Sequence, residues 1–508
     1  MLSGFRSLAR HTIVYGAGDI FGRAISVILL PIYVRELTTE ENGIISLAFA
    51  FIGFSAVFYS LGLNQAVVRY LSAREGEGVL KERLSTAFIA LFVIGGIFSA
   101  ILYSKASAFS NVLLGSPRHS DILRLIAGIL FLDALSGTLF AGFRAQQRST
   151  AHSTIRLIQN TMQLGLTVYL ILFQDQGARA VFIGNLVSSA FAVAACGILS
   201  ARHLGFCLRT TELKRLLAFG VPFVPSAFAM LAIALSDRFL IRHFLGLEAA
   251  GIYGVAYKLT IPMALVVGSF RSAWAPAILA ETRTEDAKAL CARVTTYVVL
   301  GGVGLFLMMS ALAGDFIRLV SGANAETYIA GRPVVPLITF AFVLYGLYIA
   351  LTAGVYVESR TRILPAIIAA GAGLNIGLNI YLIPRLGFIG AAWSTVAAYG
   401  LMTTMLLLSV QRFYRVSYEY RRLLKIAVVS AICTLLIVNN LENESISGMV
   451  GRICFAAAFP LLLWGWGFYL PGEWQAVRTL LGKRGSASVQ KKPSPDESCD
   501  DLIPPRGT

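Results

Sequence analysis

Long apolar stretches recur along nearly the whole chain and are separated by short polar connections. Each stretch has about 20 residues, the length that an α-helix needs to cross the hydrocarbon core of a bilayer. The strands of a membrane barrel would be alternating segments of about 10 residues, so the pattern excludes a barrel. We therefore expect an all-α integral membrane protein with about fourteen transmembrane helices. The expected spans are residues 12–34, 44–66, 86–105, 121–143, 154–173, 180–201, 215–242, 250–271, 293–314, 333–357, 363–383, 388–411, 423–440 and 451–470.

The composition supports this expectation. Hydrophobic residues make up 56% of the chain and charged residues only 14%, and the mean hydropathy is +0.71. Soluble globular domains carry roughly 25% charged residues. The composition is therefore that of a polytopic membrane protein.

Lysine and arginine residues are divided unevenly between the two sides of the predicted membrane. If the amino terminus is cytoplasmic, 29 of them fall in the cytoplasmic connections and ends, and 10 fall in the outside connections. This positive-inside bias indicates an even number of spans with both termini in the cytoplasm. It also explains most of the net charge of +16, so a nucleic-acid partner is not needed to account for that charge.

Two pairs of segments along the chain resemble each other. The partners are 208 residues apart in the first pair, where Gly43 aligns with Gly251, and 206 residues apart in the second. This repeat predicts two six-helix lobes related by a pseudo-two-fold axis along the membrane normal, a plan common in secondary transporters. The alternative is that such similar segments recur by composition alone. The matched segments are residues 31–52 with 239–260, and residues 182–190 with 388–396.

The expected organisation of the chain has four parts. An N-lobe contains spans one to six, and a C-lobe contains spans seven to twelve. Two further spans precede a polar tail, which we expect to be cytoplasmic and disordered from about residue 482. The four parts are residues 1–201, 202–411, 412–470 and 471–508.

Several sequence runs resemble one known family of membrane proteins. LLPIYVRELTTEENGIISL is followed by GLNQAVVRYLS, then SDRFLIRHFLGLEAAGIYGVAYKL leads into AWAPAILAE, and LNIYLIPRLGFIGAAWSTVAAYG comes last. Together they look like the polysaccharide transporter (Wzx-like flippase) branch of the multidrug/oligosaccharidyl-lipid/polysaccharide (MOP) exporter superfamily. The likeness extends over spans one to twelve.

This resemblance implies both a fold and a function. It implies a two-lobed alternating-access flippase with fourteen helices in the bacterial cytoplasmic membrane. The substrate would be a polyprenyl-diphosphate-linked oligosaccharide, moved to the outer leaflet for surface polysaccharide (O-antigen or exopolysaccharide) synthesis. Besides this lipid and the bilayer, polysaccharide-assembly proteins are candidate partners.

Basic residues within or at the ends of the spans are the candidates for binding the diphosphate. Arginine donates two hydrogen bonds at once from a planar fork, whereas lysine supplies a point charge. A charge at the centre of a span costs about 2.5 kcal/mol on insertion scales, and such residues usually serve a function. For the two candidates at the cytoplasmic ends of spans two and eight, Arg69 and Arg271, the alternative is snorkelling to the headgroups. The set comprises Arg23 in span one, Arg238 in span seven, Lys258 in span eight, Arg69 and Arg271.

Three acidic residues within the spans are candidates for a coupling-ion site or a charge pair. Asp19 lies four residues before Arg23 on the same helix face, and Asp237 is next to Arg238, so a structural ion pair is the alternative role of both arginines. Asp133, near the middle of span four, has no local basic neighbour. It must find one across the bundle, be protonated or bind a cation, unless it only bonds to a neighbouring hydroxyl. If transport is coupled to H⁺ or Na⁺, Asp133 and Asp19 are the candidates.

Polar faces in spans five and eleven are the candidates for binding sugar hydroxyls, because an amide both donates and accepts hydrogen bonds. Span five carries Arg156, Asn160 and Gln163 on one face, and span eleven carries Asn375 and Asn379 one turn apart. The alternative is that they form hydrogen bonds between helices, worth about 0.6 kcal/mol each.

Other functions agree less well with the sequence. It contains no HExxH motif, no glycine-rich phosphate loop and no metal-ligand cluster, so we expect neither an enzyme nor a cofactor. A membrane polysaccharide polymerase or ligase would, by resemblance, have a large outside loop, which is not predicted here. A multidrug or cation exporter would need an acidic binding site for its substrates. A flippase for a peptidoglycan lipid precursor, which has the same diphosphate carrier, stays an alternative, as does a scaffold for polysaccharide-assembly enzymes.

Overall fold

The computed structural model describes residues 28–71, 77–205, 207–279, 284–441 and 445–470. These residues form helices joined by short connections, with no strand among them. Twelve of the described helices are long and apolar enough to cross a membrane. The expectation of an all-α membrane protein is therefore confirmed.

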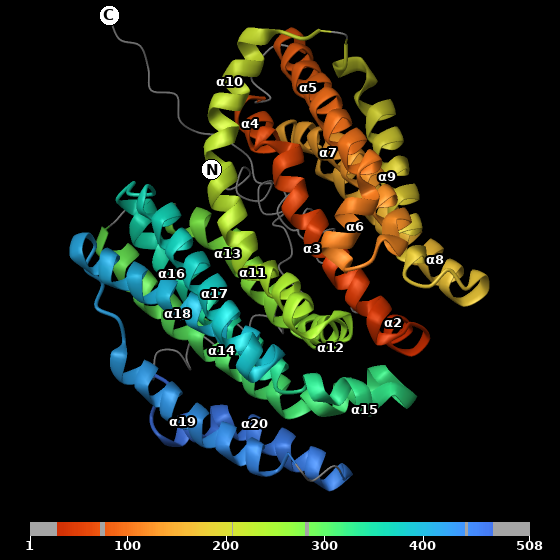
Figure 1. Cartoon of the computed structure of the whole chain (residues 1–508). Coiled ribbons are helices and arrows are strands. Elements are labelled where there is room, and N and C mark those ends of the chain that lie inside the picture. Colours follow the sequence, from red (N-terminus) through yellow and green to blue (C-terminus); the bar gives the residue numbers. More distant parts are fainter. Residues whose placement is uncertain (1–27, 72–76, 206, 280–283, 442–444, 471–508) are drawn as a thin grey trace, which may run out of the picture.

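Helices from the first part of the chain pack around α7 (Ser120–Ala145), as Figure 1 shows. The first described helix is α2 (Leu30–Glu36). Short 3-10 helices precede α7 and follow α9. The helices that contact α7 are α3 (Thr39–Ser60), α4 (Leu63–Tyr70), α5 (Glu77–Ser104), α6 (Ala106–Leu114), α8 (Ser149–Gln174) and α9 (Arg179–Ser200), and the 3-10 helices are η1 (Pro117–His119) and η2 (Ala201–His203).

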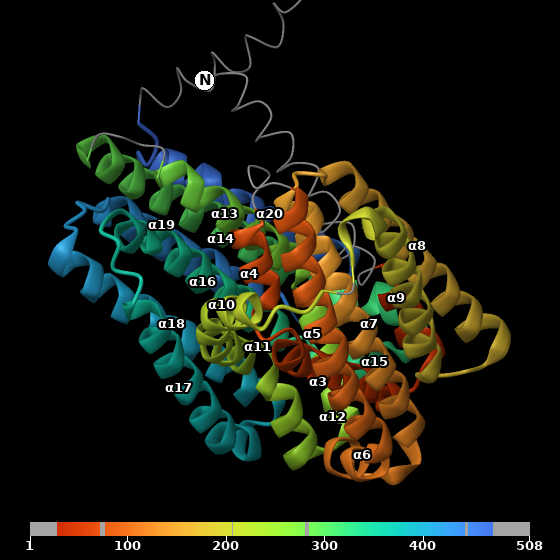
Figure 2. The same ribbon diagram turned by 90° about the horizontal axis from the view of Figure 1, so that it is seen from above.

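Helices from the middle of the chain form a second group, which lies beside the first when seen from above (Figure 2). In this group α16 packs against α13, α14 and α18, while α17 packs against α11 and α18. Its α-helices are α11 (Val224–Leu245), α12 (Leu247–Lys258), α13 (Ile261–Leu279), α14 (Thr284–Ser321), α15 (Ala325–Tyr328), α16 (Val334–Val357), α17 (Ile363–Leu386) and α18 (Phe388–Phe413), with 3-10 helices η3 (Val221–Phe223), η4 (Gly322–Asn324) and η5 (Ile329–Gly331). The helix that precedes them, α10 (Thr210–Gly220), packs against α4 and α5 of the first group.

The last two described helices lie on the outside of the second group. α19 (Tyr420–Asn439) and α20 (Ile446–Gly465) pack against each other and against α14, as the blue helices of Figure 1 show. Arg452 on α20 is buried and donates to both carboxylate oxygens of Asp315 on α14, at 2.9 and 3.0 Å. This ion pair fixes the outer helices to the second group.

Most expected spans coincide with a helix, and the differences have physical causes. Apart from its last residues, the first span (12–34) lies outside the described residues. The fifth span is helical, as α8, but it is not among the twelve apolar helices because it carries a polar face. The eighth span (250–271) is divided between α12 and α13. The ring of Pro262 would clash with the carbonyl of Lys258 in a continuous helix, so α12 ends at that lysine.

The two groups of helices meet where α3 crosses α12. A Cβ atom on Gly43 would lie 2.1 Å from the carbonyl oxygen of Leu247, and one on Gly251 would lie 2.1 Å from that of Thr39. Only glycine permits so close an approach of two backbones. Thr39 and Leu247 are separated by the same 208 residues as the two glycines. The contact is therefore reciprocal, as in an interface about a two-fold axis.

The start of α3 is fixed by a capping box. The hydroxyl of Thr38 accepts a hydrogen bond from the backbone N–H of Glu41, and the Glu41 carboxylate accepts one from the backbone N–H of Thr38. The same carboxylate accepts from the backbone N–H of Ala178, beside the start of α9, at 3.0 Å. These bonds hold the end of α3 that crosses α12.

Candidate functional site

A cavity of about 330 Å³ lies between the two groups of helices. Residues of α2, α3 and α8 line it on one side, and residues of α11, α12 and the start of α13 line it on the other. Four of the residues singled out in the sequence are among its lining residues: Arg238, Lys258, Asn160 and Gln163. The structure thus brings together two bases and two amides that are far apart in the chain.

Arg238 is held in place by its own helix, α11. Its Nη1 donates to the carbonyl oxygen of Ala234 at 2.7 Å and to Oδ1 of Asp237 at 3.0 Å. The guanidinium carbon lies 4.5 Å from the ring centroid of Tyr257, a cation–π distance. The ion pair that the sequence left open as an alternative is therefore present, and Arg238 also lines the cavity.

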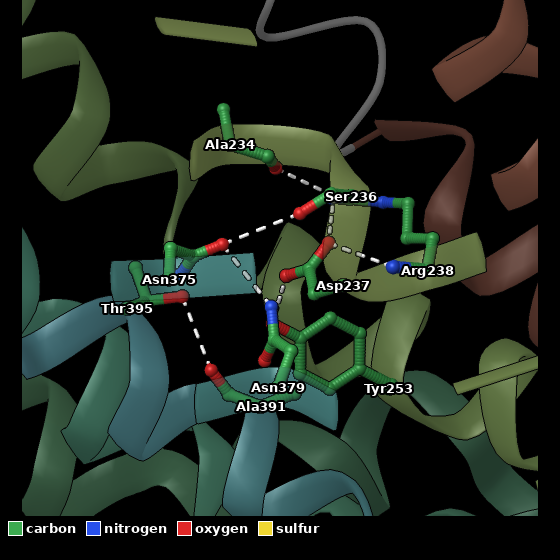
Figure 3. A network of polar contacts seen from close by, with 9 residues as sticks. All are labelled: Ala234, Ser236, Asp237, Arg238, Tyr253, Asn375, Asn379, Ala391 and Thr395. Carbon is green, nitrogen blue, oxygen red and sulfur yellow. Dashed lines mark hydrogen bonds and ion pairs between the residues drawn. The ribbon is translucent and has the colours of Figure 1, made fainter. Parts of the chain in front are cut away.

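Asp237 is completely buried and has several partners (Figure 3). Besides the ion pair with Arg238, its carboxylate accepts hydrogen bonds from the hydroxyl of Tyr253 and from the backbone N–H of Arg238. A buried carboxylate is tolerated when it is paired and its remaining lone pairs are bonded. Asp237 therefore neutralises Arg238 and fixes its direction.

Lys258 brings a second positive charge to the cavity. It is the last residue of α12, and its Nζ lies 4.9 Å from the ring centroid of Tyr33. No acidic residue is among the described residues that line the cavity. Because Asp237 offsets only one of the two cations, the cavity has an excess of positive charge, which attracts anions.

Only part of the polar face of α8 lines the cavity. Asn160 and Gln163 line it, together with the hydroxyl-bearing Ser46 of α3. Arg156, one turn earlier, is not among the lining residues. Its guanidinium carbon lies 4.2 Å from the ring centroid of Phe140, and its Nη1 donates to Oε1 of Gln159 at 3.2 Å.

Asn375 and Asn379 of α17 are completely buried and do not line the cavity. Oδ1 of Asn375 accepts hydrogen bonds from Ser236 of α11 at 3.2 Å and from Nδ2 of Asn379 at 3.1 Å (Figure 3). The first bond joins α17 to α11 beside Asp237, and the second lies within α17. Asn375 therefore makes the interhelical bond that was the alternative, and neither asparagine is exposed to the cavity.

Arg69 and Arg271 lie away from the cavity and are exposed. The guanidinium carbon of Arg69 lies 4.7 Å from the ring centroid of Phe219. Arg271 donates from Nη1 to the hydroxyl of Tyr345 at 3.2 Å. Both positions agree with basic side chains that extend towards a headgroup region.

Asp133 of α7 lies in a different environment from Asp237. It lines a second cavity of about 280 Å³, and its Oδ1 accepts a hydrogen bond from Ser189 of α9 at 2.7 Å. It forms no ion pair with another described residue. The remaining two candidates, Asp19 and Arg23, lie outside the described residues.

The aromatic lining of the site was not predicted from the sequence. Tyr33, Phe49 and Tyr257 line the larger cavity, and Tyr253 supports Asp237. Tyr253 and Tyr257 are one helical turn apart, and Tyr257 directly precedes Lys258. The sequence signal for this lining is a pair of tyrosines four residues apart, next to a basic residue, within one span.

No three His, Cys, Asp or Glu side chains gather as a metal site within the described parts of the chain. The charged side chains of the larger cavity are instead suited to holding an anionic group between two helix groups.

Comparisons with known sequences agree with the resemblance found above. A family model described as polysaccharide biosynthesis protein matches residues 32–329, more than half of the chain. The teichuronic acid biosynthesis protein TuaB of Bacillus subtilis is 23% identical over 298 residues, which is 57% of this chain and 59% of TuaB. An uncharacterized membrane protein of Methanocaldococcus jannaschii is 20% identical over 410 residues, which is 74% of this chain and 79% of that protein.

Solved structures share the fold. The lipid II flippase MurJ, in an inward closed conformation, matches with a TM-score of 0.71 and 14% identity over 89% of this chain and 99% of that chain. An inward-facing multidrug resistance MATE family transporter of the MOP superfamily matches with a TM-score of 0.65 and 14% identity over 78% of this chain and 96% of that one. The MOP-type transporter fold implied by the sequence is thus confirmed. The chain belongs to the polysaccharide biosynthesis protein family.

Proposed function

We propose that this membrane protein is an alternating-access flippase for a polyprenyl-diphosphate-linked oligosaccharide. It moves this lipid from the cytoplasmic to the outer leaflet of a bacterial cytoplasmic membrane, for the synthesis of a surface polysaccharide such as an O-antigen or exopolysaccharide. The observation that carries the proposal is the positively charged cavity between two helix groups, lined by Arg238 and Lys258. Membership of the family and the transporter fold support it.

The proposed architecture has two six-helix lobes, residues 1–201 and 202–411, related by a two-fold axis along the membrane normal. Residues 412–470 supply the last two of fourteen spans, residues 471–508 form a tail, and both ends of the chain are cytoplasmic. The reciprocal contact of Gly43 and Gly251 supports the two-fold relation. In this topology the connection before α3 is outside, so the crossing of α3 and α12 closes the outer side of the cavity.

In this proposal the diphosphate binds to Arg238 and Lys258. Two phosphates carry more than one negative charge, and the pair of cations exceeds the single charge of Asp237. The guanidinium supplies directed hydrogen bonds, and the lysine supplies a mobile charge. Arg23 is expected to act on the same group.

Sugar hydroxyls bind to Asn160 and Gln163, whose amides donate and accept. Arg156 supports this face of α8 through its neighbour Gln159. Asn375 bonds to Ser236 and so holds α17 against α11 beside Asp237, and Asn379 bonds to Asn375. Arg69 and Arg271 attract the anionic lipid at the cytoplasmic headgroups before it enters.

If transport is coupled to H⁺ or Na⁺, the two described acids differ in their suitability for binding the ion. Asp237 is already paired with Arg238, so we assign it to a charge pair. Asp133 has no such partner among the described residues, so we assign coupling to it, with Asp19 as a further candidate in the first span.

The proposal is tested in a strain from which the gene and any paralogue have been deleted. We complement the deletion with wild type, Arg238→Ala, Lys258→Ala or Arg23→Ala, and measure the lipid-linked oligosaccharide on each leaflet. We expect accumulation on the cytoplasmic leaflet in the deletion strain, rescue by wild type and no rescue by the three variants. Arg385→Ala is the matched control, because Arg385 is an exposed membrane-helix arginine that contacts Tyr381, 3.8 Å from its ring centroid. Normal outward translocation in the deletion strain would contradict the proposal.

The same experiment separates the alternatives. A peptidoglycan-precursor flippase would change the distribution of the precursor lipid and leave the surface polysaccharide lipid unaffected. A multidrug or cation exporter would need an acidic lining, whereas the described lining residues of the larger cavity include two bases and no acid. A polymerase or ligase would change the length or attachment of the polysaccharide, and a scaffold would tolerate neutralisation of the arginines.

A further inference from the structure

A third cavity lies on the first group of helices and shares no lining residue with the two cavities described above. Its volume is about 760 Å³, and its lining residues come from α5, α7 and α9. Both α5 and α9 pack against α7 (Figure 1), so the cavity is a groove between two helices with α7 as its floor. None of the described residues that line it belongs to the second group.

Small side chains give the groove its width. Gly96 and Ala100 of α5 and Gly128 of α7 are among its lining residues. On α5 the neighbouring side chains of Ile97 and Ile101 are 55% and 50% exposed. Exposed isoleucines on a membrane-spanning helix face the acyl chains of a bilayer. The groove is therefore accessible to lipid.

The second group of helices has aromatic rings at the corresponding position. Gln147 and Ser359 follow α7 and α16, have left-handed φ angles of 56° and 53°, and are 212 residues apart. By the same offset Gly128 corresponds to Phe340 of α16. The ring centroid of Phe340 lies 5.8 Å from that of Phe306 on α14. The second group thus packs rings of its own chain where the first group has a groove.

The end of the groove at the last turn of α5 carries an excess of positive charge. Arg179, the first residue of α9, lies with Nε 3.4 Å from Oδ2 of Asp121. The guanidinium carbon of Arg124 lies 5.7 Å from the ring centroid of Tyr103, and this arginine has no ion pair within the described part of the chain. Asp121 is the one acid among the described lining residues, so two arginines and one acid leave a net charge of +1.

These bases lie on the side of the membrane where bases are fewer. In the proposed topology α5 ends outside, and α7 and α9 begin there, so Arg124 and Arg179 are at the outer headgroups. Arginine donates paired hydrogen bonds to phosphate, and tyrosine is enriched at the boundary between membrane and water. An apolar groove with two arginines at its headgroup end matches a lipid with an anionic headgroup.

We propose that this groove binds an anionic glycerophospholipid, such as phosphatidylglycerol, from the outer leaflet. The phosphate accepts hydrogen bonds from Arg124 and Arg179, and one acyl chain lies in the groove between α5 and α9. A lipid with a single phosphate charge balances the net charge of +1. The inference goes beyond the proposed transport function and does not depend on it, because the proposed orientation decides only the leaflet.

The test measures lipid binding to the full-length protein by native mass spectrometry, with phosphatidylglycerol and phosphatidylethanolamine of the same acyl chains. We expect wild type to bind one phosphatidylglycerol about tenfold more tightly than phosphatidylethanolamine, and Arg124→Gln to lose this preference with one charged hydrogen bond. Arg118→Gln is the matched control: it is the same substitution at an exposed arginine on the same side of the first group, outside the lining, and affinity should be unchanged.

A second pair of variants tests the position of the acyl chain. Ala100→Phe puts a ring into the groove and keeps both arginines, and since Ala100 is exposed the fold is retained. Lost burial of two CH₂ groups of the chain weakens phosphatidylglycerol binding about tenfold. Ile101→Phe changes the next residue, which is exposed and outside the lining, and should bind as wild type does.

Four outcomes would overturn the proposal. The first is a wild-type protein with equal affinity for the two lipids, and the second is wild-type affinity in Arg124→Gln or in Ala100→Phe. The third is an equal loss in Arg118→Gln, which would mean unspecific attraction of headgroups. The fourth is a wild-type dimer that Ala100→Phe converts to a monomer, which would assign the groove to a second copy of the chain. Flipping is not part of the readout, so failure of the proposed function would leave this site standing.

Discussion

The crossing of α3 and α12 offers a direct test of the proposed closed outer gate. Replacing Gly251 by alanine puts a Cβ 2.1 Å from the carbonyl oxygen of Thr39 and 3.0 Å from the backbone nitrogen of Gly43. Both neighbours are backbone atoms, so no side-chain rotation relieves the clash. Overpacking of this kind costs about 1–3 kcal/mol. If the crossing separates in the outward state, that energy shifts the equilibrium towards the open form by about 5- to 150-fold.

The assay is a distance measurement between spin labels at Glu40 and Glu248. Both residues are exposed, and they are equivalent positions in the repeat at the crossing. We expect wild type to show mainly a short distance and Gly251→Ala to show a larger population at a longer distance. Gly43→Ala should have an effect of similar size, because its Cβ would meet the carbonyl oxygen of Leu247 at the same 2.1 Å.

Gly377→Ala is the control for this experiment. Gly377 lies within α17, and a Cβ there would meet no atom within 4 Å, so the distances should stay as in wild type. The reasoning is refuted if Gly251→Ala and Gly43→Ala are stably folded and keep the wild-type distribution. It is refuted equally if Gly377→Ala opens the crossing to the same extent.

Three further predictions concern the charged residues. Arg238→Met leaves Asp237 buried without its cation, so we expect a loss of about 3–5 kcal/mol in stability, measured as a lower unfolding temperature, with partial recovery when Asp237→Asn is added. Lys258→Met breaks no ion pair with a described residue and removes only the cation–π contact with Tyr33, so stability should change by no more than about 1 kcal/mol, while the affinity for a polyprenyl diphosphate, measured by titration, should fall at least about tenfold. Arg452→Ala removes both bonds to Asp315, so α20 should loosen from α14, with a loss of about 1.5–3 kcal/mol and faster hydrogen exchange in α20.

The long apolar stretches were sufficient to predict the helices, because a membrane admits little else than helices or closed barrels. The same constraint allowed Arg238 and Lys258 to be predicted as functional residues, since a basic residue within an apolar stretch is rare and usually serves a function. The alignment of Gly43 with Gly251 also pointed to residues that touch in the structure. These features depend on local composition and spacing, which a sequence displays directly.

The orientation of polar faces could not be predicted in the same way. Asn375 and Asn379 resemble Asn160 and Gln163 in the sequence, yet the first pair is buried in the packing, where Asn375 bonds to α11, and the second pair lines the cavity. Amide side chains form hydrogen bonds either at an interface between helices or in a polar cavity. Only the packing of the neighbouring helices decides between these two environments. The break between α12 and α13, by contrast, has a signal in the sequence, because Pro262 cannot continue a helix that contains Lys258.

The two cavities are linked by the helices that they share. Along α3, Ser46, Phe49 and Ala50 line the larger cavity, and the lining of the Asp133 cavity begins at Ala56, about 9 Å further along the same helix. α11 likewise contributes Arg238 to one cavity and its first turns to the other. A change in the packing of α3 against α11 must therefore alter both sites at once. Under this arrangement the coupling ion proposed for Asp133 and a diphosphate at Arg238 influence each other by an equal factor, because binding couplings are reciprocal. The coupling ion should accordingly change the affinity for the lipid in wild type and have no effect on it in Asp133→Asn.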